Sequence, residues 1–125
     1  MSSRKSTPRK MSKKTPNIMN SLDFKIDETE ADFQHRVASL ARLRGWSVYA
    51  VPDSRRASMS GYPDLTMFHP RQRRLIFAEL KREKGKLSPA QVDVLDKLRE
   101  VKRNVGIEVY VWRPSDWDNV VITLQ

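Results

Sequence analysis

The chain has 125 residues and carries 24 lysines and arginines against 15 aspartates and glutamates, which gives a formal charge of +9 and a pI near 10.2. This length accommodates one small domain, and no apolar run approaches the ~20 residues of a membrane span. There is no cysteine, and the histidines are His35 and His69. The composition therefore excludes disulfides and thiolate or histidine-rich metal sites. A metal would have to bind carboxylates, which select hard ions such as magnesium or manganese.

The N-terminal segment, residues 1–22, is basic and contains no acidic residue; its six cations are Arg4, Lys5, Arg9, Lys10, Lys13 and Lys14. Serine, threonine, proline and asparagine fill most of the other positions, which predicts a disordered arm. The arm is either a solubilising terminus or a nonspecific tether for a polyanion. No hydrophobic stretch follows the basic start, so we expect no signal peptide and a cytoplasmic protein. Residues 23–125 form the predicted domain, which is only mildly basic.

The first half of that domain reads as a helix followed by three strands. Apolar residues recur at helical spacing from Phe33 to Ala41, after a possible capping box over residues 27–30, and Gly45 is the predicted stop. Three runs rich in β-branched and aromatic residues follow, separated by a serine- and arginine-containing loop and by a basic turn at Pro70–Arg73. These predicted strands are Trp46–Val51, Asp64–Phe68 and Leu75–Leu80.

The second half adds a helix and a further strand. Ser88 as N-cap, Pro89 in the first turn and Gln91 three residues after the serine are typical of a helix start. Ile107–Trp112 is predicted as the fourth strand, and the β-branched run Val120–Leu124 as a fifth. The order αβββαβ predicts an α/β fold with a mixed sheet flanked by helices. Neither a GxxxxGK phosphate loop nor a GxGxxG fingerprint occurs.

Chemistry-bearing residues gather at the ends of two neighbouring strands. Glu79 and Lys81 share one face of their strand because side chains alternate. If the two strands form a hairpin around Pro70–Arg73, Asp64 lies near the same end of the sheet as Glu79. Paired carboxylates repel each other unless a divalent cation reverses the sign of the interaction. The alternatives are a turn acid at Asp64 and an ordinary solvent-facing pair at Glu79 and Lys81.

The first helix offers another carboxylate, Glu30, which the helix cap alone would also explain. Gln91 is equally explained by its position in the second capping box. His35 and His69 are predicted to be surface residues, and Trp46, Trp112 and Trp117 to be core or interface residues.

These residues resemble the PD-(D/E)xK nuclease superfamily, with Pro63-Asp64 as the PD and Glu79-Leu80-Lys81 as the ExK. The run from Gly61 through Phe77–Lys81 to Gln91 is similar to the VRR-NUC (virus-type replication-repair nuclease) branch, in particular its small stand-alone phage and bacterial members. The resemblance implies a restriction-endonuclease-like core. It also implies magnesium, replaceable by manganese, on Asp64, Glu79, the Leu80 carbonyl and Glu30. Lys81 would stabilise charge on the scissile phosphate, and Gln91 would orient the nucleophile or Lys81.

The expected substrate is DNA, bound through basic residues that flank the catalytic end: Arg55, Arg56, Lys84 and Lys86. The resemblance implies an endonuclease that cuts branched or Holliday-junction DNA as a homodimer, since two cuts need two sites. Aromatic residues near the C-terminal end, Trp112 and Trp117, are predicted to contribute to the dimer interface. The alternatives are a noncatalytic DNA-binding protein with a nuclease fold and a restriction-type or nonspecific nuclease.

Overall fold

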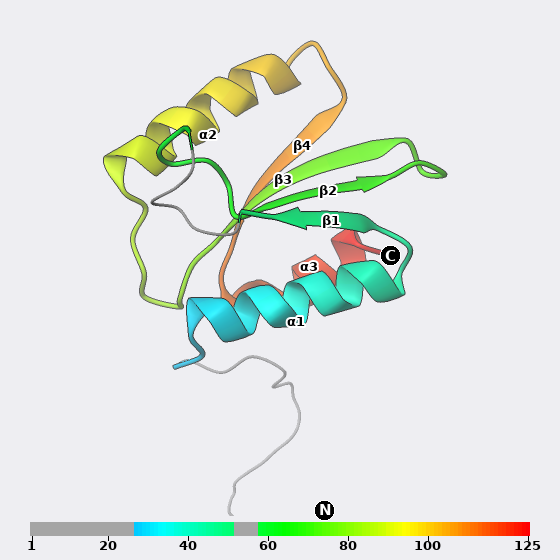
Figure 1. Cartoon of the computed structure of the whole chain (residues 1–125), viewed down its shortest axis with the longest axis horizontal. Coiled ribbons are helices and arrows are strands. Elements are labelled where there is room, and N and C mark those ends of the chain that lie inside the picture. Colours follow the sequence, from blue (N-terminus) through cyan, green and yellow to red (C-terminus); the bar gives the residue numbers. More distant parts are fainter. Residues whose placement is uncertain (1–26, 52–57) are drawn as a thin grey trace, which may run out of the picture.

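A computed structural model describes residues 27–51 and 58–125 (Figure 1). The predicted arm, residues 1–22, and the predicted DNA-binding residues Arg55 and Arg56 lie outside these ranges. None of the helices within them has the length and apolar character needed to cross a membrane. In chain order the elements are α1 (Glu30–Leu43), β1 (Ser47–Ala50), β2 (Leu65–His69), β3 (Arg74–Leu80), α2 (Pro89–Lys102), β4 (Ile107–Trp112), the 3₁₀ turn η2 (Pro114–Asp116) and α3 (Trp117–Thr123).

The four strands form one mixed sheet in the order β1-β2-β3-β4. The β1–β2 and β2–β3 pairs are antiparallel, and β4 runs parallel to β3 because α2 carries the chain back across the sheet. In the β2–β3 hairpin Leu65 lies opposite Ala78 and His69 opposite Arg74. The predicted α/β class with a mixed sheet flanked by helices is confirmed.

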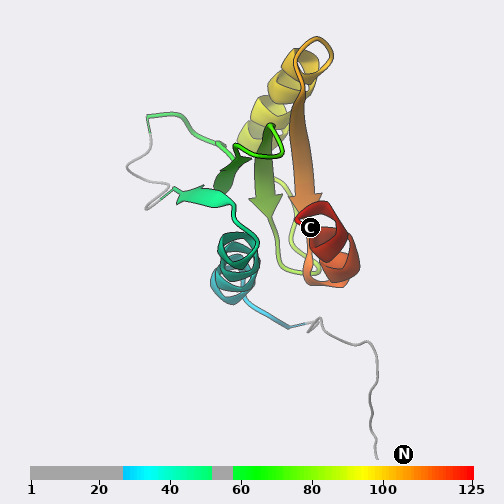
Figure 2. The same ribbon diagram turned by 90° about the vertical axis from the view of Figure 1, so that its right-hand side faces the viewer.

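The helices divide between the two faces of the sheet. Figure 2 shows α1 and α3 on one side and α2 on the other. On the α1 and α3 side, Ile76, Ala78 and Leu80 of β3 belong to the larger core cluster. The intervening residues of β3, Leu75 and Phe77, pack on the other face against the smaller cluster that includes Leu95 of α2. Glu79 and Lys81 continue this second series and therefore lie on the α2 face.

Helix α1 starts later than the predicted capping box. Thr29, not Asp27, is the N-cap, and its Oγ1 accepts a hydrogen bond from Asp32 N–H at 3.1 Å. Glu30 is therefore the first helical residue and not a capping-box partner. The predicted stop is confirmed, since α1 ends at Leu43 and Gly45 has φ +92°, a conformation that favours glycine.

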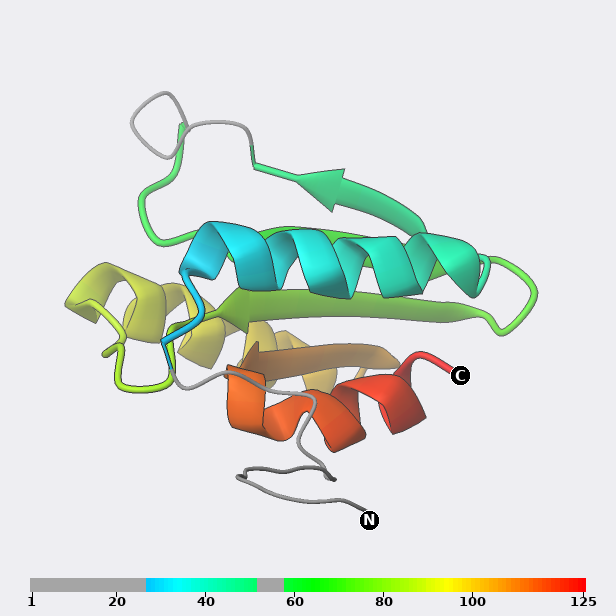
Figure 3. The ribbon, with the colours of Figure 1, turned by 90° about the horizontal axis from the view of Figure 1, so that it is seen from below.

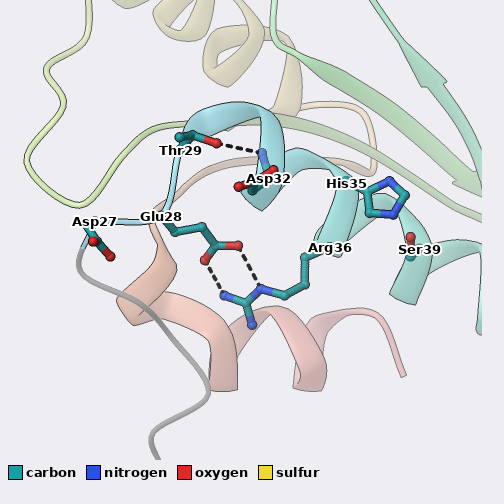
Figure 4. Close-up of a pocket in the computed structure, with 7 residues that line it drawn as sticks. All are labelled: Asp27, Glu28, Thr29, Asp32, His35, Arg36 and Ser39. Atoms are coloured by element: carbon teal, nitrogen blue, oxygen red, sulfur yellow. Dashed lines mark hydrogen bonds and ion pairs between the residues drawn. The ribbon is translucent and has the colours of Figure 1, made fainter.

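Arg36 of α1 contacts both the segment before the helix and α3, and Figure 4 shows its pairing with Glu28. Its guanidinium forms two hydrogen bonds with Glu28, at 2.8 and 3.1 Å. It also lies 4.0 Å from the centroid of the Trp117 ring, a cation–π contact. Figure 3 shows α1 and α3 lying along the same face. Trp117 is therefore half-buried within the monomer.

The predicted fifth strand at Val120–Leu124 is wrong, because α3 spans Trp117–Thr123. Val120 and Leu124 are fully buried, whereas Ile122 between them is 63% exposed; one face of a helix gives this pattern, but in a strand Ile122 would share the buried face. The preceding Arg113 and Asp116 form a capping box that starts the helical turns. Burial outweighed the β propensity of the run.

Two predictions about single residues need correction. Trp112 is only 3% exposed and stacks on Tyr110 inside the domain, so the core role predicted for it is confirmed and the dimer-interface role is wrong. His69 is buried instead of lying on the surface: its Nε2 is 3.2 Å from the Arg44 carbonyl oxygen, and its ring meets Trp46 edge-on. His35 is exposed, as predicted.

Candidate active site

The predicted acidic residues meet where β2 begins and β3 ends. Asp64 immediately precedes β2. Because Leu65 pairs with Ala78 in the antiparallel register, the next residues, Asp64 and Glu79, lie opposite each other. The two side chains therefore share the α2 face of the sheet. Asp64 Oδ2 accepts a hydrogen bond from Leu80 N–H at 2.9 Å, which fixes the Asp64 carboxylate at the end of the hairpin.

Glu79 is the buried centre of this group. Its side chain is 1% exposed, and its two oxygens have different surroundings. Oε2 accepts a hydrogen bond from Gln91 Nε2 at 2.9 Å and lies 3.9 Å from Lys81 Nζ. Oε1 is buried and accepts no hydrogen bond from the described part of the chain. A buried carboxylate oxygen without a partner is costly, so this atom needs a proton or a cation.

The electrostatics of Glu79 lead to the same requirement. Burial, together with the charge and hydrogen bonding of Asp64, raises the pKa of Glu79 from an ordinary value of 4.5 to about 8. Lys81 acts in the opposite direction but does not compensate, and the charge of Glu30 adds a smaller increase. Metal-free Glu79 therefore holds a proton near neutral pH. A divalent cation between the carboxylates would favour the ionised form.

Lys81 directly follows β3, and its ammonium belongs to the same group of charged side chains as Glu79. The residue is 8% exposed, and its N–H donates to the Trp112 carbonyl at 3.0 Å, which holds this end of β3 against β4. The 3.9 Å between Lys81 Nζ and Glu79 Oε2 is longer than a hydrogen bond. Its ammonium protons are thus not committed to Glu79.

Gln91 occupies the predicted capping position and also contacts Glu79; its predicted role toward the nucleophile or Lys81 stays a prediction. It is the third residue of α2, where its Oε1 accepts from Ser88 N–H at 2.8 Å and its own N–H donates to the Ser88 hydroxyl at 3.2 Å. The same side chain donates from Nε2 to Glu79. The capping box therefore holds the amide in place beside Glu79, and the two interpretations do not exclude each other.

The loop before Asp64 packs closely on the start of α2. Gly61 has φ +85°, and a Cβ there would lie 2.4 Å from the carbonyl carbon and oxygen of Ala90. The Tyr62 ring meets Phe77 edge-on, with 6.2 Å between centroids. A cavity of about 290 Å³ lies at this junction, and Asp64 and Gln91 are among its lining residues. The sequence indicated a motif glycine here, but not the backbone contact that requires it.

The donor set fits a hard divalent ion. Within the described residues, no three histidine, aspartate or glutamate side chains form a metal-binding group. Magnesium commonly takes only one or two carboxylates and completes its shell with waters and substrate oxygens. The Leu80 carbonyl points to the same side of β3 as the Leu80 N–H that bonds Asp64. Asp64 and Glu79, whose Oε1 is unpartnered, would therefore supply carboxylate oxygens to such an ion, and the Leu80 carbonyl would be the further donor on the Asp64 side of β3. Glu30 is exposed and affects Glu79 only through its charge.

Two hydrogen bonds to the segment after β4 anchor the basic loop that follows β3. Its exposed cations include the predicted DNA contacts Lys84 and Lys86. Glu83 Oε1 accepts from Ser115 N–H at 2.9 Å, and Arg113 Nη2 donates to the Gly85 carbonyl at 2.8 Å. No local pattern indicated these two hydrogen bonds, because they join residues about thirty positions apart.

The family model for the VRR-NUC domain matches residues 7–116. This match begins within the basic N-terminal segment and includes every element from α1 to β4. No curated protein and no solved structure matches the chain. The matched range contains the αβββαβ elements, the Asp64–Glu79 pair and Gln91, in agreement with the resemblance seen in the sequence. The chain therefore belongs to the VRR-NUC family of nucleases, whose substrate is DNA.

Proposed function

We propose that this protein is a metal-dependent endonuclease that hydrolyses phosphodiester bonds of DNA at the Asp64–Glu79 site. The observation that carries the proposal is the unpartnered Oε1 of buried Glu79, next to the second carboxylate, Asp64. A folded protein keeps such an atom at a cost unless something binds it. In a nuclease domain that ligand is a divalent cation.

Each residue has a role that follows from its surroundings. Asp64, Glu79 and the Leu80 carbonyl would hold magnesium, or manganese in its place. When bound, the ion lowers the pKa of a water and neutralises charge on the scissile phosphate. Gln91 holds Glu79 Oε2 and so leaves Oε1 available as a ligand. Lys81, whose ammonium is not hydrogen-bonded to Glu79, would stabilise the negative charge that develops on the phosphate.

The DNA contacts and the substrate preference form the finer part of the proposal. Lys84 and Lys86, together with Arg55 and Arg56, would contact phosphates, which gives salt-sensitive affinity without base specificity. Glu30 would contribute charge, or a water-mediated ligand, from the start of α1. We propose branched or junction DNA as the substrate and a homodimer as the particle, because a four-way junction needs two cuts and a two-fold particle supplies two sites.

The site is tested with isosteric variants. Asp64→Asn and Glu79→Gln should each abolish cleavage of junction DNA in magnesium and in manganese, while DNA binding in EDTA is retained. Lys81→Ala should also inactivate the protein. Glu100→Gln is a matched control, because Glu100 is an exposed carboxylate on α2 away from the site. It should cleave like the wild type.

Three outcomes would change the assignment. Wild-type cleavage rates in the Asp64 and Glu79 variants would reject the site. A wild type that binds junctions but cleaves nothing in either metal would favour a noncatalytic DNA-binding protein. Equal cleavage of duplex plasmid and junction would favour a nonspecific nuclease. Light scattering at micromolar concentration tests the dimer, and a monomer both free and on junction DNA would remove the paired-cut mechanism.

A further inference from the structure

Within residues 27–51 and 58–125, no helix covers part of the α2 face of the sheet. Helix α2 packs on the β3–β4 side, whereas Tyr49 of β1 and Phe68 of β2 are 56% and 46% exposed. Both side chains are on the α2 face, because their neighbours Val48 and Met67 pack into the core on the opposite side. Two large aromatic rings are therefore presented to solvent on strands that also position the candidate active site.

These rings are aligned with Asp64. Tyr49 lies opposite Thr66 in the β1–β2 register, so it is a diagonal neighbour of both Asp64 and Phe68 on the same face, at about 7 Å from each. Phe68 is four residues along β2 from Asp64, or about 13 Å. Asp64, Tyr49 and Phe68 thus form a stripe that begins at the metal-binding carboxylate. At about 3.4 Å per stacked nucleotide, its length corresponds to about four bases.

The charge around the stripe favours a nucleic-acid strand as its occupant. On this face of β1, β2 and β3, the only acidic residues in the described ranges are Asp64 and Glu79 themselves. Exposed arginines, Arg71 and Arg73, lie in the β2–β3 turn beyond Phe68, and the exposed loop lysines, Lys84 and Lys86, follow the catalytic end of β3. Aromatic rings between cations are the pattern of a single-strand binding surface, where bases stack and phosphates pair with the cations.

We propose that Tyr49 and Phe68 form a stacking platform for unpaired bases next to the scissile phosphate. This inference rests on the proposed nuclease function and deepens it by naming the substrate class: DNA with a single-stranded segment, such as a flap, a gap or an opened branch. A continuous duplex keeps its base faces stacked on each other, so it offers nothing to these rings. The preference for branched DNA then comes from the β1–β2 surface as well as from the shape of the catalytic end.

The test compares binding of flap, single-stranded and blunt duplex DNA by fluorescence anisotropy in EDTA, so that no cleavage is needed. Tyr49→Ser and Phe68→Ser should each weaken binding of flap and single-stranded DNA by about tenfold or more and leave duplex binding unchanged. The salt dependence should not change, because no phosphate contact is removed. Tyr49→Phe should behave as the wild type. Ile122→Ser is the matched control, because Ile122 is an equally exposed apolar residue on α3, on the other side of the sheet.

A second measurement places the bases directly. 2-Aminopurine in the first nucleotides of the flap should be quenched by the wild type and by Tyr49→Phe, but not by Tyr49→Ser. Equal losses on flap and duplex DNA, or a defect in Tyr49→Phe as large as in Tyr49→Ser, would overturn the platform. So would a change of oligomeric state in the serine variants, because the face would then contact a second copy of the chain. A wild type that shows the Tyr49-dependent preference yet cleaves nothing supports the platform and refutes the nuclease proposal.

Discussion

The burial of Glu79 predicts that the metal-free protein becomes less stable as the pH rises. In the folded chain the pKa of Glu79 is about 8, whereas the unfolded chain has the ordinary value of 4.5. Between these values the folded state keeps a proton that the unfolded state has released. The free energy of unfolding then falls by about 1.4 kcal/mol for each pH unit. The stability that protonation of Glu79 gives the folded state is fully present below pH 4.5 and is lost by pH 8. The total loss in the free energy of unfolding is up to about 5 kcal/mol.

Glu79→Gln should remove this slope, because the amide is neutral at every pH. The variant is expected to be about as stable as the wild type near pH 5 and more stable at pH 8. The assay is urea unfolding in EDTA at constant ionic strength from pH 5 to pH 8.5. Glu100→Gln serves as control, since the Glu100 side chain is 74% exposed and its substitution should leave the slope unchanged. Added magnesium or manganese should stabilise the wild type most at the alkaline end, where the carboxylate is ionised, and should have little effect on Glu79→Gln.

Parallel stability curves for the wild type and Glu79→Gln across this range would refute the reasoning. They would mean that the Glu79 carboxylate is solvated or paired in solution, and the argument for a cation at Oε1 would lose its support. A slope that disappears in Glu79→Gln, without any stabilisation of the wild type by either metal, would place a proton and not a cation at this atom.

Three further predictions concern Gln91, Gly61 and the N-terminal segment. Gln91→Ala should lower stability by about 1 kcal/mol through the lost cap and reduce cleavage by about tenfold or more, whereas Gln91→Glu should keep the cap in thermal unfolding at pH 7 and still lose cleavage. Gly61→Ala should destabilise the fold by at least about 1–2 kcal/mol, because φ is +85° and the new Cβ meets the Ala90 backbone; a wild-type melting temperature would contradict this. Removal of residues 1–22 should leave the fold and metal-dependent cleavage intact but flatten the salt dependence of DNA binding; an unchanged slope in salt-titrated binding would contradict the tether interpretation.

The elements whose signals are local were predictable from the sequence. The Ser88–Gln91 capping box and the glycine stop of α1 each depend on a few consecutive residues, and both occur where the sequence indicated. The alignment of Asp64 with Glu79 was also predictable, because a short turn fixes the register of an antiparallel hairpin. The nuclease signature lies at the end of such a hairpin, so its geometry followed from spacing alone.

The C-terminal helix was not predictable in the same way. The run from Val120 to Leu124 has strong β propensity, and its burial at positions four apart could not be distinguished from the alternation of a strand without knowing its neighbours. Trp46, nearly eighty residues away, donates from Nε1 to the Leu124 carbonyl at 3.0 Å. Contacts of this range decide the conformation of a short segment, and the sequence contains no local sign of them.

The same limit applies to function. Alternation along β1 and β2 says which side chains share a face, but not whether a helix covers that face. Tyr49 and Phe68 therefore read as ordinary strand residues until the path of α2 is known, since α2 packs over β3 and β4 and stops short of β1. A hairpin positions the candidate catalytic carboxylates, which are visible in the sequence, whereas the surface proposed to select the substrate depends on which strands a helix covers. Variation in the length or tilt of that helix would thus change substrate preference while leaving the Asp64–Glu79 pair intact.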